Sequence, residues 1–217
     1  MNSQIDRLEL LALLNKGLDY PLVLLVAPPG SGKSVLLEQW QNHLCQLARS
    51  PKVMRFETSP KLNEGDVIFS LIFDALKSMT PLWEASFFNL FKDDSQVDEV
   101  TLIEVFLEAF TQLAHDLVII FDDFHHISSA RIHRIMNTLV SKLPTHVSIL
   151  LSSRRYPQFS IAKLKLKEAV LIIDGNDLRI NAEELLTLNQ SICGSQLETR
   201  RISTLLTQTE GWFVGTN

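Results

Sequence analysis

The chain has 217 residues, of which 46% are hydrophobic and 21% charged, and its net charge is −5. This is the composition of a globular protein with enough apolar material for one large or two small domains. An acidic chain is a poor candidate for wrapping nucleic acid by bulk charge. Two isolated cysteines, Cys45 and Cys193, suggest no disulfide framework, which favours a cytoplasmic location. No apolar run is long enough to span a bilayer, so we expect no membrane partner.

Apolar patterning predicts helices and strands that alternate along the chain. The expected elements, in chain order, are a helix at 7–14, a strand at 21–27, a helix at 33–48, a strand at 53–56, a helix at 66–79, a helix at 99–114, a strand at 116–127, a helix at 129–143, a strand at 146–155, a strand at 169–174 and helix from 181 onward. Asp66 is expected to cap the helix at 66–79, and the run NAEE at 181–184 has the spacing of a capping box. Residues 81–96 are ambiguous.

Continuous apolar strands separated by helices predict an α/β fold with a five-stranded, mainly parallel sheet flanked by helices on both faces. We expect a nucleotide-binding domain of the P-loop NTPase type at 1–180. The strandless stretch 181–217 is expected to form a C-terminal helical extension, the start of a helical subdomain. Because the chain stops in the middle of a pattern, we expect it to be the first part of a longer protein.

A phosphate-binding loop is predicted between the first strand and the next helix, in the run LLVAPPGSGKSVLLEQW. Gly30 and Gly32 allow the backbone to curl so that successive N–H groups point at an anion, and the following helix adds its positive end. Lys33 can reach the β- and γ-phosphates, and the Ser34 hydroxyl can bind Mg²⁺. Ala27 stands where glycine is usual, but a small residue suffices there if its φ is negative. The predicted nucleotide contacts in this loop are Pro29, Gly30, Ser31, Gly32, Lys33, Ser34 and Val35.

Two acids follow the strand LVIIFDD. Asp122 and Asp123 stand at its carboxyl end, which is where ligands bind in open α/β sheets. We expect Asp122, with Ser34, to support Mg²⁺, and Asp123 to orient or deprotonate an attacking water.

Two arginines follow the next strand, in the run ILLSSRRYP. If this strand lies between the two strands that carry the loop and the acids, Arg154 faces the γ-phosphate, where it can sense that group and stabilise charge in transfer. Arg155 is expected to point outward. The predicted catalytic residues are therefore Lys33, Asp123 and Arg154.

Two other features have simpler explanations. The pair His125 and His126, with His133 further on, lacks the partners of a recognised metal site, so a polar loop is expected. The run KLKLK at 163–167 is interpreted as a solvated face of a strand or helix.

Several motifs, taken in order, resemble the nucleotide-binding domain of STAND-type signalling ATPases, in the branch of MalT-like, large LuxR-type transcriptional regulators. The resemblance includes the helix before the first strand, with Arg7 at the arginine of the family, and the phosphate loop APPGSGKS. It continues through FETSPKLNEGDVIFSLIFDAL, through IIFDDFHHI with His125, and through LLSSRRYPQFSIAKLKLK with Arg154 at the sensor arginine. It ends at TEGWFVG, which is similar to the G-W-x-x-G element of the family.

The resemblance implies that ATP or ADP, with Mg²⁺, is the cofactor, and that Arg7, Gly211 and Trp212 lie near the base. Many family members have proline at the position of Phe213, and stacking by Trp212 or Phe213 can replace that contact. It also implies an ATP form that self-associates and a closed ADP form. DNA would be bound only through a C-terminal helix-turn-helix domain that is absent from this chain.

The sequence therefore favours an ATP-binding, slowly hydrolysing switch module of a signal-responsive transcriptional regulator. The alternatives are a P-loop small-molecule kinase, a DNA-acting AAA-type ATPase, and a degenerate module that binds nucleotide without turnover. A kinase needs an acceptor pocket and a lid, and a DNA motor needs an arginine finger and a basic channel.

Overall fold

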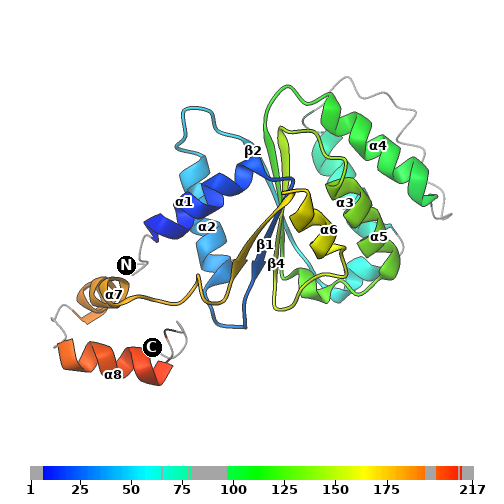
Figure 1. Cartoon of the computed structure of the whole chain (residues 1–217). Helices are drawn as coiled ribbons and strands as arrows, with labels where there is room; N and C mark the ends of the chain where they lie inside the picture. Colours follow the sequence, from blue (N-terminus) through cyan, green and yellow to red (C-terminus); the bar gives the residue numbers. More distant parts are fainter. Residues whose placement is uncertain are drawn as a thin grey trace.

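A parallel sheet lies between two layers of helices (Figure 1). The computed structural model describes residues 7–64, 66–77, 79, 97–193, 199–209 and 211. The strands are β1 (Leu22–Val26), β2 (Lys52–Glu57), β3 (Leu117–Asp122), β4 (Val147–Ser153) and β5 (Val170–Asp174). The helices are α1 (Leu8–Lys16), α2 (Lys33–Leu44), α3 (Val67–Lys77), α4 (Glu99–Thr111), α5 (Ala130–Val140), α6 (Ile161–Leu166), α7 (Ala182–Cys193) and α8 (Thr199–Thr209), with short 3₁₀ turns η1 (Gly17–Asp19), η2 (Pro60–Asn63) and η4 (Phe124–His126). The predicted fold class is confirmed.

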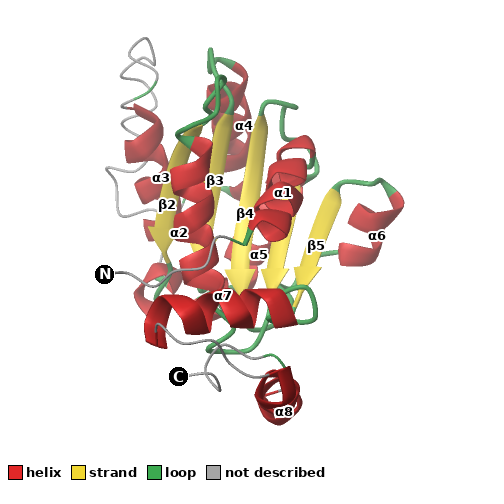
Figure 2. Ribbon diagram, turned by 90° about the vertical axis from the view of Figure 1, so that its left-hand side faces the viewer, coloured by secondary structure: helices red, strands yellow, loops and turns green. Residues whose placement is uncertain are grey.

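The order of the strands is β2-β3-β4-β1-β5, and every neighbouring pair is parallel. β4 therefore lies between β3 and β1, the arrangement on which the prediction for Arg154 depended. Since all strands run the same way, their carboxyl ends lie together at one end of the sheet, the end nearest α7 and α8 in Figure 2. This end is called the carboxyl edge of the sheet.

Each face of the sheet has its own apolar core. In β1, Leu22 and Leu24 pack with the helices α3, α4 and α5, whereas Val23 and Leu25 pack with α1 and α2. Alternate side chains of a strand point to opposite faces, so a strand covered on both sides is apolar throughout. β1, β3 and β4 are buried at every position.

Several predicted boundaries extend too far. The strand predicted to reach residue 127 ends at Asp122, because Asp123 takes a left-handed conformation (φ 55°, ψ 36°) and starts η4. The helices predicted to reach 48, 114 and 143 end at Leu44, Thr111 and Val140. Residues 81–96 lie outside the described part of the chain.

Asp66 stands at the N-cap position of α3, as predicted, and its carbonyl oxygen accepts from Ser70 N–H at 2.9 Å. Its carboxylate accepts from the N–H of Val97 and from the guanidinium of Arg131 on α5. Arg131 also donates to Val97 O, and Arg134 of α5 pairs with Glu99 of α4 at 2.6 Å. These ion pairs tie α5 to α4 and to the start of α3.

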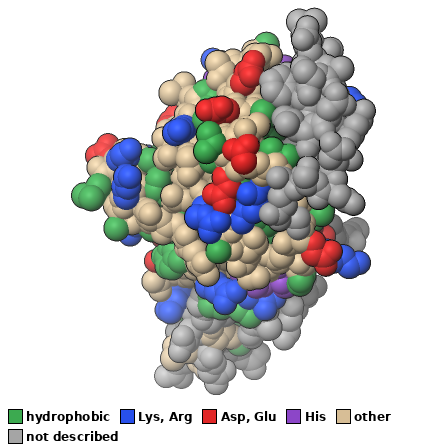
Figure 3. Space-filling view, turned by 90° about the vertical axis from the view of Figure 1, so that its right-hand side faces the viewer, with side chains coloured by type: hydrophobic (Ala, Val, Ile, Leu, Met, Phe, Trp, Pro, Cys, Tyr) green, Lys and Arg blue, Asp and Glu red, His purple; other side chains and the backbone are tan. Residues whose placement is uncertain are grey.

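On the side of the molecule shown in Figure 3, acidic and basic side chains are interspersed.

The capping box that opens α7 is confirmed. Asn181 N–H donates to Glu184 Oε2 at 3.0 Å, and Glu184 N–H donates to Asn181 Oδ1 at 2.8 Å. Ile180, Leu185 and Ile202 form a small apolar cluster of their own, separate from the two cores of the sheet. Among the described helices, none has the length and apolar character of a membrane span.

Candidate nucleotide-binding site

The loop between β1 and α2 has the shape of an anion cradle. Gly30 and Gly32 have φ values of 78° and 84°, a region that L side chains rarely adopt, and Gly32 is the residue that caps α2. A Cβ atom built on Gly32 would meet no atom within 4 Å, so the space above the first turn of α2 is open. Ala27 has no positive φ, so a glycine is not needed there.

Lys33 lies at the centre of this cradle and is buried. Its Nζ donates to Ala27 O at 2.8 Å and to Pro28 O at 2.9 Å, and it contacts Ser31 Oγ at 3.4 Å. Burial is the main cause that lowers the pKa of Lys33, while the negative charge of Asp123 opposes this shift. The lysine thus connects the start of α2 to the carbonyl oxygens of the loop that precedes it.

Asp122 is buried beside the loop, at the carboxyl end of β3. Its Oδ1 accepts from the N–H of Asp123 at 3.0 Å, and its Oδ2 accepts from Arg55 Nη2 at 2.8 Å. Burial is the largest influence and favours the protonated acid, but the Arg55 guanidinium and the nearby hydroxyls of Ser152 and Ser34 together outweigh it and lower the pKa of Asp122. The carboxylate is therefore ionised and close to the Ser34 side chain.

Asp123 is held in a strained conformation, since left-handed backbone is uncommon for residues other than glycine. Its Oδ1 lies 3.5 Å from His125 Nδ1. Both ring nitrogens of His125 are buried and lack a hydrogen-bond partner among the described residues. Burial chiefly lowers the pKa of His125, and the nearby cations Arg154 and Lys33 add to the shift. His125 thus lies in the short turn η4 after β3, a loop position as predicted, beside the carboxylate of Asp123.

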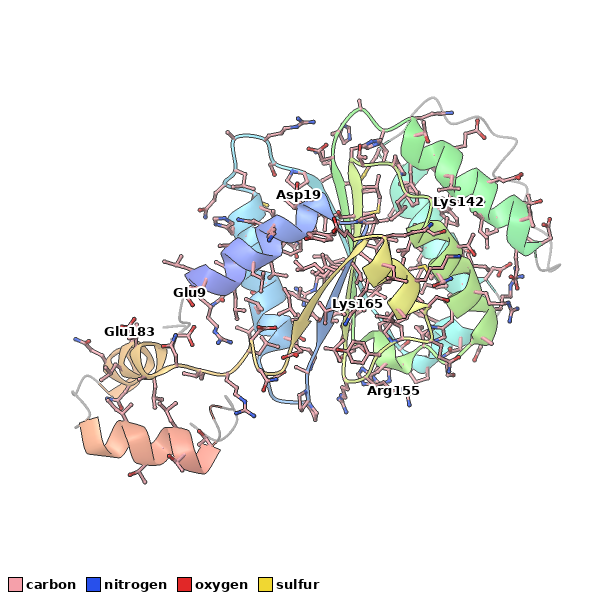
Figure 4. All side chains as sticks on the ribbon, in the orientation of Figure 1. Glu9, Asp19, Lys142, Arg155, Lys165 and Glu183 are labelled. Carbon is pink, nitrogen blue, oxygen red and sulfur yellow. The ribbon has the colours of Figure 1, made fainter. Side chains whose placement is uncertain are left out.

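Arg154 and Arg155 follow β4 and are both exposed. The positive charge of Arg154 contributes to the lowered pKa of Lys33 and of His125, so the three groups interact electrostatically. Arg155 lies at the carboxyl edge of the sheet (Figure 4), where its Nη2 donates to His125 O at 3.3 Å. Arg155 is exposed, as expected of a side chain that points outward, but it also contacts the turn that follows Asp123.

Arg7 connects the start of α1 to α7 and to the segment before it. Its guanidinium donates to Leu178 O and Arg179 O, both at 2.9 Å, and its Nε pairs with Glu184 Oε1 at 3.0 Å. Gly211 joins the same segment, since its carbonyl accepts from the N–H of Ile180 at 2.8 Å. The structure thus brings Arg7 and Gly211 together, as part of a helical junction. Trp212 and Phe213 lie outside the described residues.

Sequence reasoning missed two residues of this site. Arg55 lies within the strand β2, and only the pairing of β2 with β3 brings it to Asp122. Ser152 is buried in β4 next to the same acid. The available signal for Arg55 was a charge between two apolar residues, Met54 and Phe56, in the interior of the strand.

A cavity of about 390 Å³ lies far from these motifs, at the amino ends of the strands. It is lined by residues that include Asp19, Arg49, Asp116 and His146. Figure 4 shows Asp19 at the end of the sheet opposite to Arg155. The cavity is therefore separate from the loop.

The residues present fit a nucleotide with its magnesium ion. The open space above Gly32, flanked by the first N–H groups of α2, suits a phosphate. The carboxylate of Asp122 and the hydroxyl of Ser34 offer the hard oxygen ligands that Mg²⁺ prefers.

The fold and this arrangement define a P-loop domain of the AAA class. The AAA domain family matches residues 19–156, and the chain belongs to this family. The resemblance to STAND-type P-loop ATPases like MalT is confirmed as well.

The relatives are large proteins. The chain is 25% identical over 215 residues to the HTH-type transcriptional regulator MalT of Vibrio campbellii, covering 98% of this chain and 23% of that protein. It is 22% identical over 211 residues to the serine/threonine-protein kinase PknK of Mycobacterium tuberculosis, covering 97% of this chain and 19% of the kinase. The chain thus spans about a quarter or less of the length of these relatives.

Solved structures share the fold. A STAND protein with a tetratricopeptide repeat sensor, PH0952 from Pyrococcus horikoshii, superposes with a TM-score of 0.64 at 14% identity, covering 99% of this chain and 29% of that one. Cdc6p from Pyrobaculum aerophilum superposes with a TM-score of 0.53 at 13% identity, covering 89% of this chain and 51% of that one.

Proposed function

We propose that this chain is the ATP-binding, slowly hydrolysing switch module of a signal-responsive transcriptional regulator of the MalT type. The observation that carries the proposal is the convergence of three motifs at one edge of the sheet. The phosphate loop after β1, the acids after β3 and the arginine after β4 belong to adjacent strands, in the order β3-β4-β1.

Each motif has a separate role in the proposal. Lys33 and the N–H groups of the loop bind the phosphates, and Ser34 with Asp122 would hold Mg²⁺, which supplies charge neutralisation when bound. Asp123 orients or deprotonates the attacking water, and Arg154 senses the γ-phosphate. An arginine that contacts ATP but not ADP is what a switch requires, because only a differential contact shifts a conformational equilibrium.

The relatives support a module whose task is regulation. The matched span is nearly the whole of this chain in both MalT and PknK, although one is named as a transcriptional regulator and the other as a protein kinase. A domain shared by proteins with different activities is expected to control those activities. On this proposal the ATP form of the full protein self-associates, and DNA is bound by another domain.

The junction around Arg7 is the proposed moving part. Arg7, Glu184 and Gly211 connect α1, α7 and the end of α8 close to the carboxyl edge of the sheet. On this proposal Arg7 and Gly211, with Trp212, lie near the base.

Hydrogen exchange of the chain loaded with Mg²⁺ and either ADP or a non-hydrolysable ATP analogue tests the proposal. We expect the amides of α7 and α8 to exchange at different rates in the two forms, while those of β1, β3 and β4 stay equally protected. Equal exchange in both forms would show a nucleotide binder without a switch. Turnover well below the median of about 10 s⁻¹ for enzymes is also expected, since a switch must remain in each state.

A further inference from the structure

Arg55 donates a hydrogen bond to one carboxylate oxygen of Asp122, the residue that would support the metal. Arg55 lies on the edge strand β2, and its Nη2 is 2.8 Å from Asp122 Oδ2 and 3.5 Å from the carbonyl oxygen of Ser34. The Arg55 side chain is 27% exposed and the Asp122 side chain 7% exposed, so the pair is shielded but open on the arginine side. The guanidinium therefore contacts both residues to which the Mg²⁺ site is assigned.

We propose that Arg55 is a resident counter-cation of the Mg²⁺ site, which pairs with Asp122 in the nucleotide-free protein and competes with Mg²⁺ for it. The inference rests on the proposed function, because it concerns the metal that accompanies the nucleotide. On this inference β2, which carries no recognised motif, controls the magnesium concentration at which nucleotide binds tightly.

The first argument is the need of Asp122 for a cation. A buried carboxylate is costly unless it is paired and hydrogen-bonded. Lys33 is a cation of the phosphate loop itself, but its ammonium group donates to the carbonyls of Ala27 and Pro28. Among the hydrogen bonds of the described residues, the charged donor to Asp122 is Arg55.

The second argument is electrostatic. A divalent cation at Asp122 and Ser34 would stand close to the Arg55 guanidinium, and like charges at such distances repel strongly in a partly buried site. Part of the Arg55 side chain is exposed at the edge of the sheet, so the guanidinium can turn toward water when the metal enters. Binding of Mg²⁺ must then replace a charge-assisted hydrogen bond, which raises the magnesium concentration required.

The test is the magnesium dependence of nucleotide binding in Arg55→Gln, compared with Arg49→Gln. Arg49 is a matched control because its Nε pairs with Asp116 Oδ2 at 3.0 Å, just before the amino ends of β2 and β3. The affinity of a fluorescent ADP analogue is measured from excess chelator to millimolar Mg²⁺. We expect the magnesium midpoint to fall about tenfold or more in Arg55→Gln, the scale of one charge-assisted hydrogen bond, and to stay unchanged in Arg49→Gln.

A second variant separates charge from shape. Arg55→Lys keeps the positive charge on a shorter side chain, so its magnesium midpoint should lie between those of wild type and Arg55→Gln. If Arg55→Gln does not fold, the comparison of Arg55→Lys with wild type still tests the inference. A midpoint that is unchanged or raised in both variants overturns the inference, because Arg55 would then be structural.

Thermal melting without nucleotide provides an independent readout. Arg55→Gln should melt at a lower temperature than wild type, and Mg²⁺ alone should recover part of that loss while leaving wild type unchanged. Absence of this recovery contradicts the inference even if nucleotide binds. If wild type binds no nucleotide at any magnesium concentration, the proposed function fails, and the melting comparison still decides the role of Arg55.

Discussion

At the scale of single residues, the backbone of Asp123 connects the fold to the proposed chemistry. Its left-handed conformation ends β3 and turns the chain into η4, which brings His125 to 3.5 Å from its carboxylate. Arg155 holds the same turn through His125 O. Such strain persists only where the surrounding structure enforces it, and it is typical of functional sites.

Asp123→Asn should bind ATP normally and hydrolyse it roughly 10²-fold more slowly, because the amide cannot act as a general base. Asparagine tolerates the left-handed conformation, so the fold should be unaffected. Asp123→Ala should lose turnover to a similar extent and also be less stable by about 1 kcal/mol, the cost of backbone strain without a tolerant side chain. Single-turnover hydrolysis and chemical denaturation measure the two effects. Wild-type turnover in both variants would assign the acid a purely structural role.

Arg154→Ala should weaken binding of ATP and leave binding of ADP nearly unchanged. A charge-assisted contact to the γ-phosphate is worth about 1.5–3 kcal/mol, which corresponds to roughly 10–150-fold discrimination. Competitive titration of the two nucleotides measures the ratio. On the proposed function, the same change should also block self-association driven by ATP.

Arg155→Ala is the comparison for that experiment, although it is not a silent control. Because Arg155 donates to His125 O, its loss should loosen η4 and slow turnover while weakening ATP and ADP equally. Discrimination lost in Arg155→Ala and kept in Arg154→Ala would show that the sensor role was assigned to the wrong arginine.

At the scale of elements, the junction at α7 joins the two ends of the described chain. The reciprocal capping box of Asn181 and Glu184 satisfies the first turn of α7, and the same Glu184 carboxylate pairs with Arg7 before α1. Gly211 has a φ of 76° and lies so close to Ile180 that a Cβ atom would be 3.1 Å from its carbonyl oxygen. The segment before α7 is thus held by both the start of α1 and the residue after α8.

Glu184→Ala should destabilise the chain by about 1–3 kcal/mol, the sum expected for one helix cap and one charge-assisted pair. Arg7→Ala should destabilise it through the same pair, and the double variant should lose less than the sum of the two single losses, because the residues interact directly. Urea denaturation of the four proteins provides the cycle. Strictly additive losses would contradict a coupled junction.

The elements most predictable from sequence were those formed by a pattern of neighbouring residues. β1, β3 and β4 were visible as continuous apolar runs because both faces are covered, and the capping box follows from a four-residue spacing. The end of β3 was missed because the left-handed turn at Asp123 carries no glycine. The site residues in the phosphate loop follow from a motif. The pairs Arg55–Asp122 and Arg7–Glu184 join residues that are distant in sequence, so they can be seen only in the tertiary structure.

At the scale of the whole molecule, nucleotide binding should be linked to folding. A ligand that binds only the native state stabilises it by about 2.7 kcal/mol at a concentration 100 times its Kd. We therefore expect Mg²⁺ with ADP or with ATP to raise the melting temperature of the chain. Inorganic phosphate at the same concentration is the control and should have little effect, since the base is absent. Equal shifts for phosphate and nucleotide would indicate a simple anion site.

The central claim is that the loop around Lys33 binds the phosphates of a nucleotide, and calorimetric titration of wild type and Lys33→Ala tests it most directly. The ammonium group of Lys33 also donates to Ala27 O and Pro28 O, so circular dichroism must first show that the variant is folded. The account predicts that wild type binds ATP and ADP with Mg²⁺, and that Lys33→Ala loses at least about tenfold in affinity for both, the scale of one charge-assisted hydrogen bond. Unchanged affinity in a folded variant, or no binding by wild type, would contradict it.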